Sequence, residues 1–138
     1  MVKTLVDAGP IIAFWNRADQ HHAWAMECFN SLRLPVFTTE PVIAEACHFI
    51  IGSGKSPAPL LGKIEDGTFE IPFQLWEQAG AVAGLMDKYE GRMDLADATL
   101  VRLSELFDDC RVVTTDYSDF SVYRRHGRQV IPLLAPPR

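Results

Sequence analysis

Short apolar runs alternate with longer amphipathic stretches along the chain, and this alternation constrains the fold more than any other feature. We expect strands at the run that ends at Asp7 and at residues 34–39, 69–72, 111–116 and 129–133. Apolar residues at helical spacing predict helices directly after Asp7 and at residues 20–32, 40–51, 58–66, 74–90 and 94–109. Strands that alternate with helices form a parallel sheet covered on both faces. We therefore predict a three-layer α/β/α sandwich with a mostly parallel sheet of four to five strands.

The length and composition predict one globular domain over residues 1–138, with 48% hydrophobic and 22% charged residues. The three cysteines are an odd number without C-x-x-C spacing, which favours reduced thiols over a disulfide scaffold or a zinc site. No basic leader precedes an apolar segment, and no apolar run approaches the roughly 18 residues of a membrane span. These patterns predict a cytoplasmic protein without a membrane partner.

Four acidic residues stand where such a fold would gather them. Asp7 and Asp116 each end an apolar run, and ligands of open parallel sheets bind at the carboxyl ends of the strands. Glu45 and Asp97 are each flanked by alanines in an apolar helical stretch, where a charge is costly unless it is paired or bound. Both helices should begin at the same edge of the sheet. We therefore expect the four carboxylates to lie together at the carboxyl-terminal edge of the sheet.

No basic residue near these acids in the sequence offers neutralisation. Two unit charges about 4 Å apart repel by roughly 4 kcal/mol at an effective dielectric constant of about 20, which is large beside a domain stability of order 5–15 kcal/mol. Oxygen ligands without His or Cys select hard divalent ions, so the pattern predicts a site for Mg²⁺ or Mn²⁺. Taken singly, Asp7 and Asp116 can also be helix caps or turn formers, and Asp94 either caps its helix or joins the site.

Four motifs follow one another along the chain: “LVDAGPIIAFW”, “EPVIAE”, “MDLADATLV” and “VVTTDYSDFSVYR”. In order and spacing, over essentially the full chain, they resemble the PIN-domain family, which includes the VapC-type ribonuclease toxins of bacterial toxin–antitoxin pairs. The resemblance implies a metal-dependent endoribonuclease on an α/β/α fold. It also implies a homodimer and inhibition by a small antitoxin.

Matched residue by residue, the resemblance assigns the catalytic, metal-binding acids to Asp7, Glu45, Asp97 and Asp116. Asp94 resembles an additional acid found in part of the family, and Asp119 resembles a frequent but less central one. Thr114 and Thr115 stand where the family has small hydroxyl residues before the fourth acid. In such a two-metal site one ion activates a water and the other stabilises the leaving oxygen, so the carboxylates act mainly as ligands and no histidine base is needed.

Charge is unevenly distributed along the chain, whose net charge is −5. Residues 40–109 hold 13 acids against five bases, whereas residues 111–138 hold five arginines against two acids. The basic segment is either a solvated face or a rim that binds anions. For an RNA substrate, we expect the phosphate contacts to come from Arg124, Arg125 and Arg128.

Two other classes of function remain open at this point. The chain could be a catalytically silent PIN-like module that binds RNA or protein, although the complete set of acids argues against this. A phosphorylatable receiver-like domain also gathers acids at strand ends. That class needs a lysine at the end of a late strand, and neither “VVTTD” nor “VIPLL” supplies one.

Overall fold

A computed structural model describes residues 1–138 and contains a five-stranded, wholly parallel sheet in the order β3-β2-β1-β4-β7. Its strands are β1 (Lys3–Val6), β2 (Val36–Phe37), β3 (Phe69–Glu70), β4 (Cys110–Val113) and β7 (Leu133–Leu134). The central strand β1 pairs with β2 on one side and with β4 on the other. Strand order therefore reverses at β1, and the predicted parallel sheet is confirmed.

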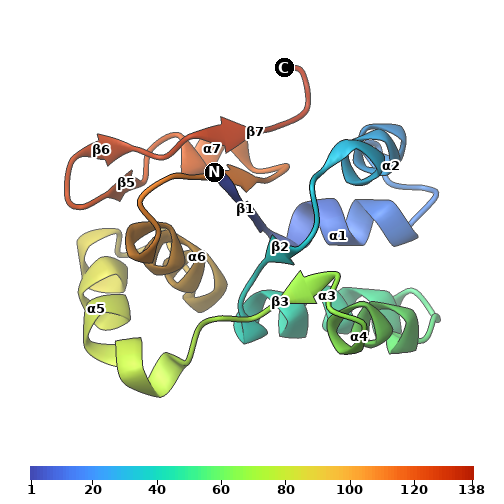
Figure 1. Ribbon diagram of the computed structural model, residues 1–138, viewed down its shortest axis with the longest axis horizontal. Helices are drawn as coiled ribbons and strands as arrows, with labels where there is room; N and C mark the ends of the chain where they lie inside the picture. The colour runs from blue at the N-terminus through green and yellow to red at the C-terminus, as the bar shows by residue number, and fades with distance from the viewer.

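Seven helices connect or follow the strands and cover both faces of the sheet. They are α1 (Ala8–Trp15), α2 (His22–Ser31), α3 (Glu40–Gly52), α4 (Ala58–Glu65), α5 (Leu75–Lys88), α6 (Leu95–Leu106) and the short α7 (Tyr117–Phe120). In Figure 1, α5 and α6 lie on one side of the strands, and α1 and α2 lie on the other. This arrangement is the predicted α/β/α sandwich. None of the helices is long and apolar enough to cross a membrane.

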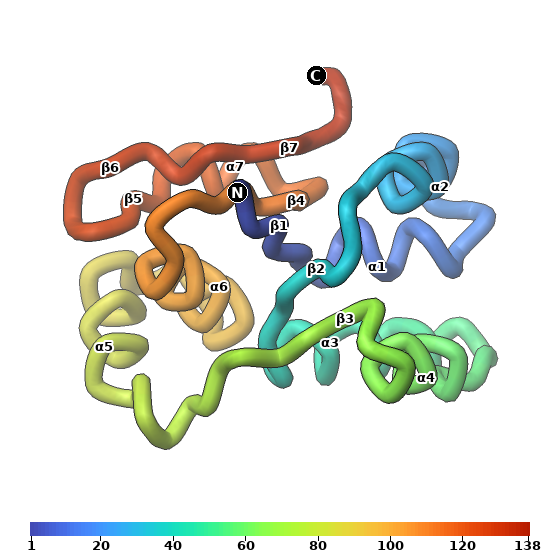
Figure 2. The backbone as a smooth tube through the Cα atoms, in the orientation of Figure 1, coloured from blue at the N-terminus to red at the C-terminus, as the bar shows by residue number.

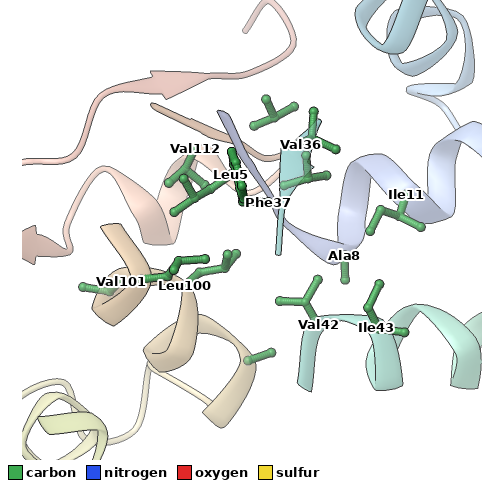
Figure 3. Close-up of a cluster of buried hydrophobic side chains, with 14 of the residues drawn as sticks. Leu5, Ala8, Ile11, Val36, Phe37, Val42, Ile43, Leu100, Val101 and Val112 are labelled. Atoms are coloured by element: carbon green, nitrogen blue, oxygen red, sulfur yellow. The ribbon is translucent and has the colours of Figure 1, made fainter. Parts of the chain in front are cut away.

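The core forms because the central strands are apolar on both faces. Leu5 of β1 and Val112 of β4 are fully buried within a cluster of 28 buried residues. Figure 3 shows Leu100 of α6 on one side of these strands and Ile11 of α1 on the other. Val42 of α3 is also fully buried, and its side chain points toward α1. Three helices and the sheet thus share one core, which fixes where α3 and α6 begin relative to the strand ends.

The chain after β4 differs from the single strand predicted over residues 129–133. Residues Gln129–Val130 (β6) instead pair antiparallel with Arg124–Arg125 (β5), and only Leu133–Leu134 joins the main sheet. Pro132 separates the two pieces, and proline cannot donate to a ladder. His126 and Gly127, with φ of 53° and 82°, form the tight turn of the hairpin. Figure 2 shows this hairpin beside α5 and α6.

Candidate metal-dependent active site

Asp7 occupies the carboxyl end of β1 and is nearly inaccessible to solvent, with a relative exposure of 6%. Because Val6 pairs in register with Val113, the residues after both strands lie side by side, and the Asp7 amide donates to the Val113 carbonyl at 2.9 Å. Asp7 Oδ1 accepts a hydrogen bond from the Ala8 amide at 2.8 Å, and Oδ2 accepts one from the Thr114 hydroxyl at 2.7 Å. Burial nevertheless raises the pKa of Asp7 from 3.8 to about 6, and two nearby carboxylates add to the rise.

Asp116 follows β4 and caps α7. Its Oδ1 accepts a hydrogen bond from the Asp119 amide at 3.0 Å, and its own amide donates to Thr114 Oγ1 at 2.9 Å. The Thr114 hydroxyl, which also donates to Asp7, therefore links the two strand-end acids. Burial, with a smaller contribution from the neighbouring Asp119, raises the pKa of Asp116.

Asp94 and Asp97 lie at the start of α6 and have different roles in the helix. Asp94 is the N-cap, because its Oδ1 accepts a hydrogen bond from the Asp97 amide at 2.8 Å. Asp97 Oδ2 instead accepts a hydrogen bond from the Tyr123 hydroxyl at 2.7 Å. Burial raises the pKa of Asp97 from 3.8 to about 8; Tyr123 opposes this rise, and the charges of Asp94, Asp7 and Asp116 increase it.

Glu45 reaches the same region from α3. The hydroxyls of Thr39, at the start of α3, and Thr99 of α6 lie 2.8 Å apart and tie the two helices together. Glu45 is exposed at the surface of α3, yet partial desolvation and the charge of Asp94 raise its pKa, and Glu45 in turn contributes to the raised pKa of Asp7. The four acids predicted from the sequence are therefore close enough to perturb one another.

The donor set of this cluster fits a hard cation. The only ion pair at its border joins Arg92 Nη1 to Asp119 Oδ1 at 3.0 Å, and none of the four acids has an ion-pair partner. No three Asp, Glu, His or Cys side chains are placed closely enough to hold one ion. Mg²⁺ usually keeps several waters and binds proteins through one or two carboxylates. An ion held by one or two of these acids and by water agrees with both observations.

Gly9, in the first turn of α1, and Thr115, directly before Asp116, lie in close contact. A Cβ atom built at Gly9 would lie 2.0 Å from Thr115 Oγ1 and 3.2 Å from Thr115 Cβ. Only glycine therefore allows the first turn of α1 to approach the segment that leads to Asp116. The predicted supporting residues have distinct places: Thr114 bonds to two acids, Thr115 packs on Gly9, and Asp119 pairs with Arg92.

A cleft of about 1020 Å³ between α3, residues 71–76 and the start of α6 borders the acidic cluster through Glu45. Its lining includes three acids, Glu40, Glu45 and Asp94, and most of its other lining residues are apolar. Trp76 stands on the cleft with 77% of its surface exposed, and its indole N–H donates to Gln74 Oε1 at 2.6 Å. An exposed, partly apolar and aromatic surface therefore adjoins the acidic cluster beside Glu45.

The three arginines predicted to contact RNA occupy different environments. Arg128 is exposed. Arg124 is half-buried, and its Nη1 donates to the carbonyls of Ser121, Val122 and Tyr123. Arg125 is buried, and its Nη2 donates to the carbonyls of Ser104 and Phe107 at the end of α6. A phosphate contact by Arg125 does not agree with this position, because its guanidinium caps a helix inside the protein.

Arg125→Ala is expected to lower the melting temperature by roughly 5–15 °C. It leaves the Phe107 carbonyl without its donor, the Ser104 carbonyl with only the weak Cys110 thiol donor, and a buried space unfilled. Arg128→Ala, on the exposed turn of the same hairpin, is the matched control and should melt within about 2 °C of the wild type. Scanning calorimetry of both variants in EDTA measures the difference. A wild-type melting temperature for Arg125→Ala would contradict the capping role.

The sequence did not identify Tyr123 or Gly9 as parts of the site, nor the ion pair between Arg92 and Asp119. Tyr123 bonds to a residue 26 positions away, and Arg92 pairs with one 27 positions away, so no local pattern signals either contact. Gly9 was partly indicated by the sequence, because a glycine two residues after a strand-end acid and directly before Pro10 is typical of a close backbone approach.

Comparison with known proteins agrees with the resemblance of the motifs. No protein-family model matches the chain. The chain is 25% identical over 126 residues to a protein named Ribonuclease VapC26 from Mycobacterium tuberculosis (strain ATCC 25618 / H37Rv). The matched region covers 89% of this chain and 93% of that protein, so the similarity extends over nearly the whole of both.

Proposed function

We propose that this protein is a divalent-metal-dependent endoribonuclease and the toxin of a type II toxin–antitoxin pair. The observation that carries the proposal is the meeting of four acids from separate elements, Asp7, Glu45, Asp97 and Asp116, with no ion-pair partner among them. Similarity to a protein named Ribonuclease VapC26 over most of both chains supports the choice of RNA as the substrate.

In this proposal the acids are ligands rather than proton donors. When bound, Mg²⁺ or Mn²⁺ lowers the pKa of a water molecule and neutralises charge at the scissile phosphate. Asp7 and Asp116 are the central ligands, because they stand at adjacent strand ends and Thr114 bonds to the Asp7 carboxylate and to the Asp116 backbone amide. Glu45 and Asp97 complete the set from α3 and α6, acting through water where they do not bind an ion directly. Asp94 holds the first turn of α6 and adds negative charge beside Glu45 and Asp97.

RNA must reach this cluster despite the net charge of −5. Arg128 is the exposed cation on the β5–β6 turn, whereas the Arg124 guanidinium already bonds to three carbonyls. Arg92 is close to the acidic cluster, because its guanidinium pairs with Asp119 and the Asp119 amide donates to Asp116. We propose Arg128 and Arg92 as the phosphate contacts, with bound metal supplying most of the positive charge at the site.

We also propose two protein partners, a cognate antitoxin and a second copy of this chain. A cognate antitoxin is expected because the motifs resemble those of VapC-type toxins and the chain is similar to a protein with that name. The proposed homodimer would cover apolar surface that the single chain leaves exposed, including Leu75 and Trp76 at the start of α5. We propose that the protein and its antitoxin act in the cytoplasm.

A cleavage assay tests the proposed function. Purified protein at micromolar concentration should cut total RNA or structured oligoribonucleotides in millimolar Mg²⁺ or Mn²⁺, and excess EDTA should abolish the cleavage. Undiminished cleavage in EDTA would contradict the metal dependence. No cleavage of any RNA in either metal would contradict the ribonuclease itself.

A further inference from the structure

Tyr123 provides the only hydrogen bond that the Asp97 carboxylate accepts. The Tyr123 hydroxyl donates to Asp97 Oδ2 at 2.7 Å, the usual length of an O–H···O hydrogen bond. The same hydroxyl is 3.3 Å from the Arg92 carbonyl, so Asp97 is the closer acceptor. No other donor bonds to the Asp97 carboxylate, which leaves its Oδ1 unpartnered.

The tyrosine ring has little freedom to move. Tyr123 is fully buried, and its ring packs edge-on against Tyr89 and Phe120 at centroid distances of 5.1 and 5.2 Å. Its amide donates to the Asp119 carbonyl at 3.2 Å, in the turn that Asp116 caps. The hydroxyl is therefore held at a fixed place relative to the segment that carries Asp116.

These contacts make Tyr123 a rigid link between two acids that no backbone hydrogen bond connects. Asp97 belongs to α6, whereas Asp116 belongs to the turn after β4. A donor fixed to the Asp116 segment therefore restrains where the Asp97 carboxylate lies relative to Asp116.

We propose that Tyr123 is a positioning residue of the metal site. Its hydroxyl holds Asp97 Oδ2, so that the carboxylate keeps a fixed orientation beside Asp7 and Asp116 and offers Oδ1 to the ion. This inference rests on the proposed metal-dependent function. It goes further by assigning a role to a side chain that is itself neither a ligand nor in contact with substrate.

The test is the variant Tyr123→Phe, which removes the hydroxyl and keeps the buried ring. Binding of Mn²⁺ to the RNA-free protein, followed by the electron paramagnetic resonance signal of free Mn²⁺, should weaken roughly 10–100-fold, as for other losses of a ligand's hydrogen-bond partner. At saturating Mn²⁺, kcat for RNA cleavage should fall by a similar factor while KM for RNA stays within about twofold.

Tyr89→Phe is the matched control, since its ring packs on Tyr123 but its hydroxyl accepts a hydrogen bond from the Arg124 amide at 3.0 Å. It should bind Mn²⁺ as the wild type does. Wild-type Mn²⁺ affinity in Tyr123→Phe, or an equal loss in both variants, would overturn the inference, because a purely structural tyrosine gives those results. A wild-type protein that binds no Mn²⁺ would overturn it as well.

A second measurement on the wild-type protein keeps the inference testable if Tyr123→Phe folds poorly. The Tyr123 hydroxyl proton should give a slowly exchanging downfield resonance that persists when Mg²⁺ is added, and its loss on Mg²⁺ addition would overturn the proposal. Failure of the ribonuclease proposal gives a different result. If the protein binds Mn²⁺, and Tyr123→Phe weakens that binding, but no RNA is cut, the positioning role of Tyr123 stands and the ribonuclease function does not.

Discussion

Asp116→Asn is expected to lower RNA cleavage at saturating Mg²⁺ by about 10³-fold or more while the protein remains folded, because a bound cation contributes several kcal/mol to charge stabilisation. Asparagine keeps the Oδ1 atom that accepts from the Asp119 amide, so the cap of α7 is preserved. It removes one charge from a cluster in which burial already raises the pKa of the acid. In EDTA the variant should therefore melt at or above the wild-type temperature.

Asp7→Asn should abolish cleavage to the same extent, with a different effect on stability. Asp7 accepts hydrogen bonds through both oxygens, from the Ala8 amide and the Thr114 hydroxyl. An asparagine amide can replace only one of these acceptors, which costs about 1 kcal/mol and offsets part of the relief from removing a buried charge. We expect a melting temperature in EDTA within about 5 °C of the wild type.

Asp66→Asn is the control for both substitutions, because Asp66 lies in an exposed turn and bonds only locally to Thr68 and Lys63. It should cleave RNA at the wild-type rate. Cleavage by Asp116→Asn within about tenfold of the wild type would contradict a ligand role. If Asp116→Asn unfolded at a much lower temperature than the wild type in EDTA, Asp116 would be required for stability, which would contradict its place in a mutually repelling acid cluster.

The strand-end acids could be predicted because a parallel sheet places the ends of its strands together. Asp7 and Asp116 follow β1 and β4, and these strands are neighbours in register. Glu45 and Asp97 could be predicted because alanine neighbours on apolar helices make an unpaired charge conspicuous. The position of each acid thus depends on local sequence and one rule of sheet geometry, and both are visible without coordinates.

The arginines could not be separated by the same reasoning. Arg124 and Arg125 are adjacent in β5, and successive side chains of a strand point to opposite faces. One face of the hairpin packs on α6, so Arg125 turns inward while Arg124 remains half-buried at the surface. The hairpin depends on the left-handed residues His126 and Gly127 and was not predicted. Without it, charge density along the sequence could not distinguish a capping arginine from a phosphate contact.

In EDTA, the melting temperature of the wild-type protein is expected to fall by roughly 5–10 °C between pH 5 and pH 8.5. The pKa of Asp7 is about 6 and that of Asp97 about 8 in the folded protein, against 3.8 for an ordinary aspartate. The folded protein therefore retains protons that the unfolded chain has already released over this range. Stability that is present at low pH is lost as the pH rises through the two folded-state values.

Asp97→Asn should flatten this pH dependence, because it removes the acid with the larger rise in pKa. Asp87→Asn, an exposed acid on α5, is the matched control and should retain the wild-type slope. The measurement is a series of thermal melts at half-unit steps of pH, evaluated as wild type minus variant so that other titrating groups cancel. A wild-type slope in Asp97→Asn, or a wild-type melting temperature that rises over this range, would contradict the acid cluster.

Added Mn²⁺ should reverse the trend, since carboxylates bind metal only when deprotonated. At pH 7.5 and a Mn²⁺ concentration about 100 times its dissociation constant, binding stabilises the folded state by about 2.7 kcal/mol, or roughly 5–15 °C in melting temperature. At pH 5.5 the protons on Asp7 and Asp97 compete with the ion, so the increase should be smaller. Asp97→Asn should lose most of the increase at pH 7.5. The negative charge that destabilises the metal-free protein is therefore also the charge that binds the metal. An equal increase in melting temperature at both pH values would show that Mn²⁺ does not bind to Asp7 and Asp97.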